Sequence, residues 1–408
     1  MHSLGRPDPP SGMMTGVSTA LADRLRRRIE RFGPITFAEF MSEALYDPAE
    51  GFYERRADGT PGPGGAVGPA GDFVTSPHVS PLFGTLLARQ IDDFDAALGG
   101  PTPFTVVEAG AGDGTLAEQI AAGLAPGLRT RAEFVLAERT ARHRALAEGR
   151  RLGAPGRVVG DVGELAPASV AGCVLANELL DNLPFNLVRG TPAGLAELYV
   201  GLGTGGASLA LIEGAVSSPD VERHAPPLRP GREAAVPTGA LAFVEAVDAV
   251  LRRGYVLLID YATSPGEDTE AWGGVHGYRR HGVVGDVLAN PGSTDVTAGV
   301  DMGVVAARSR ELGLIVWGPV TQRDALAALG FADELEARRR DQVGHLGEGR
   351  GTEAVRAFSA RAAAGLLVER GGLGDFAVLC LGKGVDGAPP RCMAASRTGD
   401  EQEEGQVT

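Results

Sequence analysis

The sequence predicts an α/β protein built on a doubly wound, mostly parallel sheet. From Phe104 onward, short apolar strands alternate with amphipathic helices, which is the pattern of successive βαβ units. A glycine-rich stretch follows the first of these strands, at the place where open sheets of this class bind ligands. The 408 residues are 43% hydrophobic and 22% charged, so the chain can bury a large core.

The N-terminal part is predicted to be helical. A helix from about Thr19 to Phe32 ends at Gly33, and the stretch PITFAEFMSEALY predicts a second, short helix. In SPLFGTLLARQIDDFDAAL the apolar residues share one face of a third helix. We assign residues 19–100 to this helical region and residues 1–18 to a disordered N-terminus.

The predicted sheet domain spans residues 101–384. Its first strands are FTVVEA, EFVLAE, RVVGD, GCVLAN and YVLLIDY, and LIVWGPV and FAVLCLG are late strands that could close the sheet. The helix GALAFVEAVDAVLRR is expected to be capped by Gly254. An insertion at about 185–238 contains LAELYVGLGTGGASLALIEG, which predicts a β-hairpin over the C-terminal edge of the sheet. Residues 385–408 are expected to form a disordered tail.

The composition excludes several classes of function. A net charge of −14 argues against a general nucleic-acid or membrane-surface binder, and no apolar run is long enough to span a membrane. Three cysteines without paired spacing suggest neither a disulfide framework nor a metal site, and His276 and His281 lack a zinc-binding arrangement. Without an export signal, we expect a cytoplasmic protein; its oligomeric state is not predicted.

The glycine-rich stretch VVEAGAGDGTLAEQI carries the first functional signal. Its third glycine comes one residue too early for a dinucleotide fingerprint, and no G-K-[ST] follows, which excludes a P-loop. Thr115 and Glu118 have the spacing of a capping box, which places the helix start. Glu108 and Asp113 would repel a pyrophosphate but favour a ligand with ammonium and sulfonium charges. This favours S-adenosylmethionine over NAD.

Acidic residues at the ends of the next two strands support this interpretation. Glu138 lies 28 positions after Gly110 (138 − 110) and can accept hydrogen bonds from ribose hydroxyls. Asp161 follows the third strand and can face the adenine amino group. Either acid could instead be an ordinary solvated loop residue, although their joint placement beside the loop favours a binding role.

Three polar residues follow the fourth strand, in CVLANELLDNLPF. Asn177, Glu178 and Asp181 are candidates for the methyl-acceptor side, and the two acids are spaced to share a helical face. Carboxylates there could orient a guanidinium for attack on a methyl group. The alternative is an ordinary helix start with solvated acids.

Eight segments in order resemble the MidA-like family of S-adenosylmethionine-dependent methyltransferases, which includes the mitochondrial complex I assembly methyltransferase. They extend from about Gly33 to Lys383: GPITFAEFMSEALYDPAEGFY, GDFVTSPHVSPLFG, VVEAGAGDGTL, LANELLDNLPF, LLIDYA, ANPGSTDVTAGVDM, WGPVTQ and GDFAVLCLGKG. The resemblance implies a class I methyltransferase sheet with a helical N-terminal region and an inserted β-hairpin region. It also implies an arginine of a protein substrate as the acceptor that becomes symmetrically dimethylated, with a respiratory complex I subunit as a candidate substrate.

The resemblance further implies the residues of the site. Those expected to bind S-adenosylmethionine are Asp72, Thr75, Ser76, Glu108, Gly110, Gly112, Glu138 and Asp161. Those expected on the catalytic, acceptor side are Asn177, Glu178 and Asp181, and no metal is implied. His78 stands where the family usually has Glu, which affects the expectation for the acceptor side. Alternatives are a scaffold protein that keeps the fold, a small-molecule methyltransferase and an NAD-linked enzyme.

Overall fold

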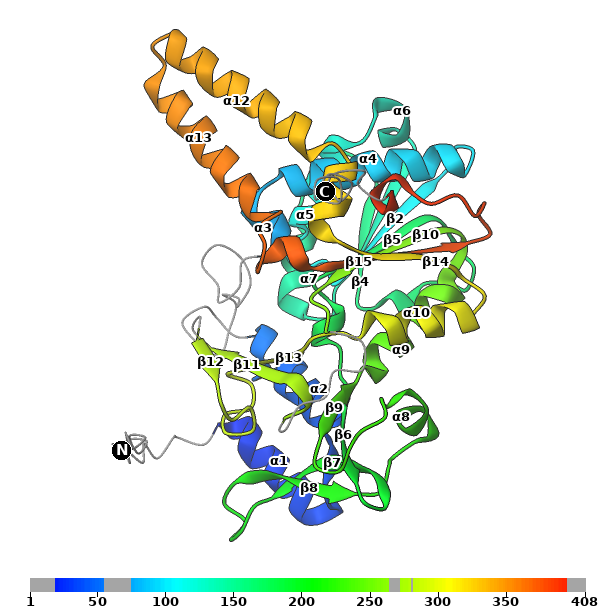
Figure 1. The fold of residues 1–408 in the computed structure, drawn as a ribbon, viewed down its shortest axis with the longest axis vertical. Helices are drawn as coiled ribbons and strands as arrows, with labels where there is room; N and C mark the ends of the chain where they lie inside the picture. The colour runs from blue at the N-terminus through cyan, green and yellow to red at the C-terminus, as the bar shows by residue number, and fades with distance from the viewer. Residues whose placement is uncertain (1–18, 55–74, 264–271, 280–281, 395–408) are drawn as a thin grey trace, which may run out of the picture.

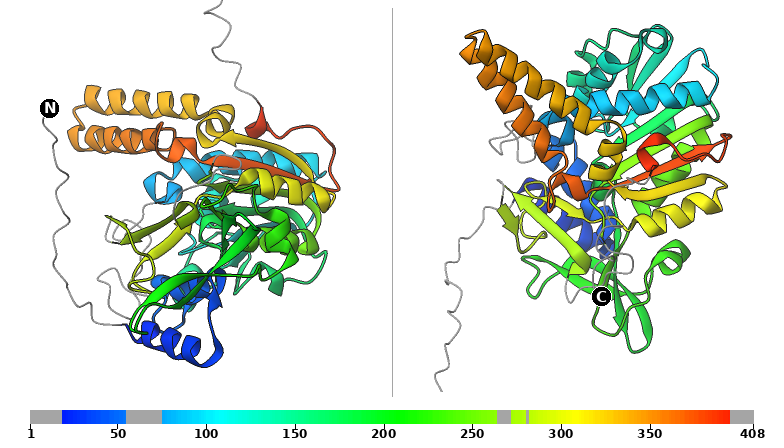
Figure 2. Two further views of the ribbon diagram at one scale, coloured as in Figure 1. Left: turned by 60° about the horizontal axis from the view of Figure 1, so that its bottom comes forward. Right: turned by 45° about the horizontal axis from the view of Figure 1, so that its top comes forward.

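The computed structural model describes residues 19–54, 75–263, 272–279 and 282–394 (Figures 1 and 2). Within these residues the main sheet has seven strands, in the order β14-β15-β10-β5-β2-β3-β4. Their bounds are β14 Ile315–Thr321, β15 Ala377–Lys383, β10 Leu251–Asp260, β5 Val170–Asn177, β2 Phe104–Ala109, β3 Ala132–Ala137 and β4 Gly156–Val159. The strands from β10 to β4 are parallel, and β15 is antiparallel to both of its neighbours. The predicted α/β class is confirmed, and the two late strands close one edge.

Helices cover both faces of the main sheet (Figure 1). On one face lie α4 (Leu82–Ala97), α5 (Thr115–Gly123) and α11 (Gln322–Ala328), and on the other lie α9 (Thr238–Val250) and α10 (Met302–Glu311). Successive residues of a strand point to opposite faces, so Val106 joins the first core and Val107 the second. Because both faces are covered, the central strands are apolar almost throughout. The remaining helices around this sheet are α3 (Ser76–Val79), α6 (Pro126–Arg129) and α7 (Ala141–Glu148).

A second layer lies at the C-terminal ends of the parallel strands (Figure 1). It contains a sheet of β1, β7, β6 and β9, with β8 also paired to β7, and a smaller sheet of β12, β11 and β13. Their bounds are β1 Ile35–Thr36, β6 Asn186–Thr191, β7 Gly194–Leu202, β8 Leu209–Gly214, β9 Glu233–Val236, β11 Val275–Arg279, β12 Gly282–Val284 and β13 Asp295–Ala298. The predicted hairpin is formed by β7 and β8. The short helix α8 (Pro219–His224) follows it.

The region predicted at residues 19–100 is divided between the two layers. Helices α1 (Ala20–Phe32) and α2 (Phe37–Tyr46) share a core with β6, β7 and β13, whereas α4 belongs to the main sheet. Strand β1, directly before α2, pairs with β7 of the insertion. Thr36 caps α2 with a capping box to Glu39, which fixes where the strand ends and the helix begins. The N-terminal helices and the insertion are therefore one structural unit.

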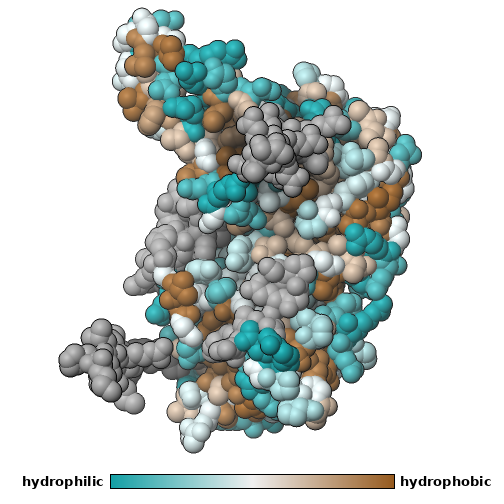
Figure 3. Space-filling model, viewed as in Figure 1, coloured by the Kyte–Doolittle hydropathy of each residue, from teal (hydrophilic) through white to brown (hydrophobic). Residues whose placement is uncertain are grey.

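A helical hairpin of α12 (Phe331–Gly347) and α13 (Gly351–Leu366) projects from the body (Figures 1 and 2). Neither helix was predicted from the sequence. Figure 3 shows apolar side chains on this projection, where Val343, Leu346, Val355 and Phe358 are exposed. No helix in the described part of the chain is long and apolar enough to cross a membrane.

Three local predictions are corrected by the structure. The N-cap of α5 is Gly114, so Thr115 is already helical and forms no capping box; Glu118 instead pairs with Arg150. Helix α9 ends at Val250 and runs directly into β10, so Gly254 lies within a strand and caps no helix. Residues 385–394 continue the fold, and their short helix η6 (Arg391–Met393) buries Cys392 and Met393. The rest of the predicted tail and the predicted N-terminus at 1–18 lie outside the described residues.

Gly254 belongs to a row of close backbone contacts across three strands. It pairs with Gly172 of β5, which pairs in turn with Thr105 of β2. A Cβ on Gly254 would lie 2.0 Å from the Gly172 carbonyl oxygen, and one on Gly172 would lie 2.1 Å from the Thr105 oxygen. Both glycines have positive φ, near 150°, which side chains of L-residues rarely allow. Glycine is therefore required by the sheet here.

We expect Gly254→Ala to lower the free energy of unfolding by about 2–4 kcal/mol, because the new methyl group meets backbone and the φ becomes strained. Urea denaturation followed by circular dichroism measures this. Gly344→Ala, in an open part of α12, is the matched control and should be neutral or stabilising by up to about 1 kcal/mol. Equal stability of the two variants would show that the strands have room at Gly254.

Candidate active site

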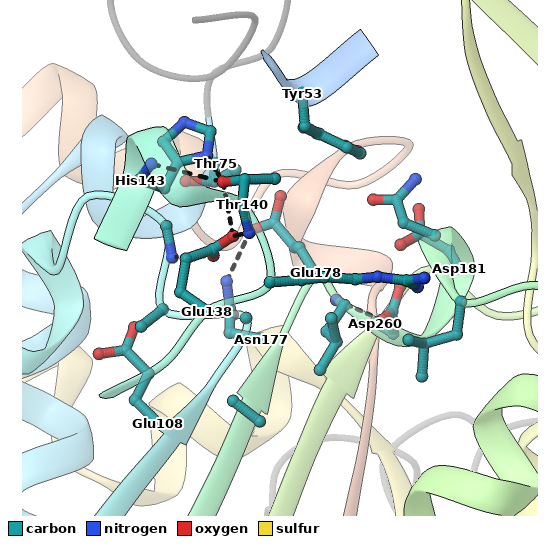
Figure 4. A pocket seen from close by; sticks show the side chains of 18 of the residues that line it. Tyr53, Thr75, Glu108, Glu138, Thr140, His143, Asn177, Glu178, Asp181 and Asp260 are labelled. Carbon is teal, nitrogen blue, oxygen red and sulfur yellow. Dashed lines mark hydrogen bonds between the residues drawn. The ribbon is translucent and has the colours of Figure 1, made fainter. Parts of the chain in front are cut away.

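A cavity of about 400 Å³ opens at the C-terminal ends of β2, β3, β5 and β10, between the two layers (Figures 1 and 4). This size suits a small-molecule ligand. Most of the predicted site residues line it: Thr75, Glu108, Gly110, Gly112, Glu138, Asp161, Asn177, Glu178 and Asp181. Ser76 is fully buried behind it, and Asp72 lies outside the described residues. The structure therefore brings together residues from four strand ends.

The glycine loop is held by hydrogen bonds from its own backbone. The N–H groups of Gly110 and Ala111 donate to the Ala137 carbonyl at the end of β3, at 2.9 and 3.2 Å. Gly112 N donates to Glu138 Oε2 at 2.9 Å. These N–H groups are therefore already occupied, whereas a pyrophosphate site requires N–H groups directed at the ligand. These hydrogen bonds argue against a dinucleotide more strongly than the glycine spacing does.

Glu138 forms the junction between the loop and the next helix. Its Oε1 accepts from the backbone N–H and the hydroxyl of Thr140, both at 2.8 Å, while Oε2 holds Gly112. Thr140 in turn caps α7. The Glu138 side chain is nearly buried and still lines the cavity, so it fixes the loop and presents an acidic edge to a ligand. Asp161 lies exposed at the rim and caps the short helix η2 (Val162–Glu164) through Gly163 N.

The sequence predicted that Glu108 and Asp113 would both present a negative charge to the ligand, and the structure corrects this prediction. Asp113 forms an ion pair with Arg150 through Oδ2, and His78 Nε2 lies 3.5 Å from Oδ1. Although burial opposes it, hydrogen bonds from His78 and Thr115 and the Arg150 charge lower the pKa of Asp113. Its negative charge is therefore neutralised by Arg150. Burial raises the pKa of Glu108 to about 8, so this carboxyl is mostly protonated at neutral pH in the absence of a cation.

Two buried acceptor atoms in the cavity wall have no hydrogen-bond donor among the described residues. They are Glu108 Oε2 and Asn177 Oδ1, at the ends of neighbouring strands β2 and β5. Buried polar atoms are rarely left without a partner. Donors on a ligand would satisfy both atoms, and an ammonium group would also favour ionisation of Glu108. The ammonium of S-adenosylmethionine fits this requirement, and a phosphate does not.

The predicted acceptor side of the cavity begins at Glu178. This residue has a left-handed backbone, with φ of 54°, and its Oε1 accepts from Ser76 N at 2.9 Å and from the Asn177 side-chain amide at 3.0 Å. Removal from water raises the pKa of Glu178 to about 7, against the effect of these two hydrogen bonds. Ser76 thus acts through its backbone to hold Glu178. The expected shared helical face is wrong, because only Asp181 lies in the short helix η3 (Leu180–Asn182).

The far wall of the acceptor side was not predicted. Asp260 ends β10, Tyr46 and Tyr53 come from α2 and the short helix η1 (Phe52–Glu54), and Asp295 and Thr297 come from β13. Thr297 Oγ1 donates to Asp181 Oδ2 at 2.8 Å, and the Tyr53 hydroxyl donates to Asp295 Oδ1 at 3.2 Å. Asp260 was identifiable from its place at a strand end, next to the predicted acids. The tyrosines and β13 carried no such local signal, because they come from the other layer.

His78 lies on the cofactor side of the cavity. Its Nδ1 contacts the Thr75 hydroxyl at 2.8 Å, and its Nε2 faces Asp113 of the glycine loop. The substitution of the family's usual Glu at this position therefore bears on the loop, and the acceptor carboxyls keep their own partners. Among the described residues no group of His, Cys, Asp and Glu has the arrangement of a metal site.

Comparisons with known proteins agree with this geometry. Residues 86–320 match the model of a family described as "Putative S-adenosyl-L-methionine-dependent methyltransferase". The chain is 30% identical over 354 residues to protein arginine methyltransferase NDUFAF7 of Bos taurus (78% of this chain, 75% of that protein). For the Mus musculus protein of that name the identity is 28% over 345 residues (78% and 76%).

A solved structure extends the likeness to the fold. A Burkholderia thailandensis protein bound to S-adenosyl-homocysteine superposes with a TM-score of 0.73 at 28% identity, covering 92% of this chain and 95% of that one. The ligand of that relative is the demethylated form of S-adenosylmethionine, the cofactor that the unpaired acceptors Glu108 Oε2 and Asn177 Oδ1 favour in this cavity. Since the family model covers more than half of the chain, the protein belongs to this family of S-adenosylmethionine-dependent methyltransferases.

Proposed function

We propose that the protein transfers a methyl group from S-adenosylmethionine to a guanidinium nitrogen of an arginine in a protein substrate. The observation that carries this proposal is the acidic end of the cavity. Glu178 and Asp181 line it beside the glycine loop, with Asp260 and Asp295 behind them. A guanidinium offers a positive charge and five N–H donors in a fixed fork, which matches a group of carboxyls.

The transfer requires mainly that the attacking nitrogen be aligned with the methyl group and that a negative charge be available to take its proton. When bound, S-adenosylmethionine supplies a methyl group on a positively charged sulfur. Glu178 would orient the attacking nitrogen, and as the N–C bond forms and the S–C bond breaks, its carboxylate would take the proton that this nitrogen releases. A carboxyl with a pKa of about 7 is well suited to accept a proton near neutral pH. The surrounding layer excludes water from the reacting groups.

The names of the relatives support arginine as the acceptor, since several are called protein arginine methyltransferases. We further propose symmetric dimethylation and, as the first acceptor to examine, a subunit of respiratory complex I. A small-molecule acceptor is the main alternative within the same chemistry. A scaffold role would require that the acceptor carboxyls take no part in any transfer.

Gly110→Val tests the cofactor loop. A Cβ at Gly110, whose φ is +68°, would lie 2.9 Å from Leu179 Cδ1, so a branched side chain would distort the loop. We expect calorimetry to show an affinity for S-adenosylhomocysteine at least about tenfold weaker. Gly99→Ala, with a φ of +75° and open space around it, is the control and should bind normally. Unchanged binding by Gly110→Val would mean that the loop does not contact the ligand.

Glu178→Gln tests the proposed transfer. Wild-type protein and labelled S-adenosylmethionine are added to a lysate from a strain that lacks the gene, and mass spectrometry identifies the modified residues. We expect label on arginine, with a rate about 10²–10⁴-fold lower for Glu178→Gln and unchanged affinity for S-adenosylhomocysteine. Label on another residue type would contradict arginine. Tight cofactor binding without any transfer would support a scaffold, and binding of NAD in place of S-adenosylhomocysteine would contradict the methyltransferase function.

The rate should depend on pH through Glu178. Its pKa is raised to about 7, so it is protonated below pH 7 and ionised above. At limiting acceptor concentration the transfer rate reports groups of the free enzyme, and we expect it to rise with pH to a plateau, with a midpoint near pH 7. This rise of the rate with pH, which we call the acidic limb of the profile, should be absent in the residual activity of Glu178→Gln. A flat profile in the wild type between pH 6 and 8 would contradict the role of this carboxyl.

A further inference from the structure

Asp260, the last residue of β10, is 1% exposed and is held by three backbone N–H groups. Its Oδ2 accepts from Leu179 N at 3.0 Å and Leu180 N at 2.6 Å, and its Oδ1 accepts from Tyr261 N at 2.8 Å. Leu179 and Leu180 are the two residues between Glu178 and Asp181. One buried side chain thus fixes the segment that carries both acceptor carboxyls.

The segment that Asp260 holds is strained. Glu178 is one of two non-glycine residues with positive φ in the described chain, and a left-handed backbone at such a residue costs about 1–2 kcal/mol. Glu178 N also donates to the Ile259 carbonyl at 2.8 Å, so the end of β10 binds this turn at three successive N–H groups. Strain of this kind persists only where its surroundings enforce it, and it is concentrated at functional sites. Here the left-handed turn brings the Glu178 carboxyl to Ser76 N and the cavity.

We propose that Asp260 is a positioning residue for the methyl acceptor: it holds the turn that directs Glu178 and Asp181 into the cavity. This inference rests on the proposed transfer to a cationic acceptor. Asp260 itself is covered by the turn and need not touch the acceptor.

Asp260 and Asp181 are two buried acids that affect each other. Burial raises the pKa of both carboxyls, and the Asp181 carboxyl raises that of Asp260 further. Hydrogen bonds oppose this shift on both sides: Asp260 accepts from three backbone N–H groups, and Asp181 Oδ2 accepts from the Thr297 hydroxyl. Asp260 therefore acts on the turn through its backbone hydrogen bonds, whichever carboxyl of the pair is protonated.

The other titratable groups around the pair come from several elements. Glu178, at the end of β5, faces both carboxyls of the pair. Asp295 on β13, Tyr46 on α2, Tyr53 and Tyr278 surround Asp181 at longer range. The cation recorded beside Tyr46 is Arg139, which lies over its ring at 4.3 Å. Besides burial, the Asp181 carboxyl raises the pKa of Glu178, whereas the hydrogen bonds from Ser76 and Asn177 lower it.

Asp260→Asn separates this role from a merely structural one. The amide can accept from one side only, so either the Leu179 and Leu180 bonds or the Tyr261 bond is lost. We expect hydrogen exchange of the Leu179 and Leu180 amides to accelerate about tenfold or more, with exchange in the glycine loop and binding of S-adenosylhomocysteine unchanged. Transfer of label to the lysate acceptors should fall at least about tenfold, and the midpoint of its acidic limb should move up, because a loosened turn weakens the hydrogen bond from Ser76 N that lowers the pKa of Glu178.

Two further variants complete the test. Asp95→Asn removes another buried carboxylate, one that pairs with Arg131 outside the cavity, and should leave the limb and the exchange at Leu179 unchanged. Asp181→Asn removes a carboxyl that raises the pKa of Glu178 but keeps the backbone bonds of Asp260, so the midpoint of its limb should move down while exchange at Leu179 and Leu180 stays slow. Where Asp260→Asn fails to fold, slow exchange in Asp181→Asn still shows that Asp260 holds the turn without help from Asp181.

Several outcomes would overturn the proposal. Unchanged exchange at Leu179 and Leu180 in Asp260→Asn would mean that Asp260 does not hold the turn. A rate that falls without any displacement of the limb would indicate only a structural role, and faster exchange at Leu179 and Leu180 in Asp181→Asn would mean that the turn is not held by Asp260 alone. If the wild type transfers no label, the proposed function fails, while the exchange measurement still decides whether Asp260 positions the turn.

Discussion

The hydrogen bonds that bind the glycine loop to the end of β3 set the identity of the ligand. Gly110, Ala111 and Gly112 all donate their N–H groups to Ala137 and Glu138. Because these N–H groups are already bonded to the end of β3, the loop offers no set of free N–H groups to a phosphate. What remains in the wall are acceptors, Glu108 Oε2 and Asn177 Oδ1, and they require a ligand that donates. The same fold class that binds dinucleotides elsewhere is thereby directed to a cationic cofactor.

The acceptor side depends on the second layer. Tyr53 and Asp295 meet across the cavity from η1 and β13, and Thr297 of β13 holds Asp181. These elements share a core with α1, α2 and the inserted strands, so the wall opposite the sheet is built from segments far apart in the chain. A change of acceptor can thus arise in this layer without disturbing the cofactor loop. This separation is consistent with a conserved chemistry and a variable substrate within one fold.

The sequence was informative where structure is determined locally. Strand β2 was predicted with its observed bounds, Phe104–Ala109, because a short apolar run followed by glycine is a local pattern. Long-range contacts decided the rest. Arg150 neutralises Asp113 from 37 positions away, and Tyr53 reaches Asp295 across 242 positions. Helices α12 and α13 were missed because α12 is polar around most of its surface and because the apolar residues of α13 are mostly alanines, which give a weak helical pattern. The binding and catalytic roles of the predicted residues stay predictions.

Burial of acids without permanent counter-ions gives the cavity its selectivity. The pKa of Glu108 is raised to about 8 at the cofactor end and that of Glu178 to about 7 at the acceptor end, in both cases mainly by removal from water. A neutral ligand leaves these carboxyls protonated and gains little, whereas a cation ionises them and restores the interaction that water would have provided.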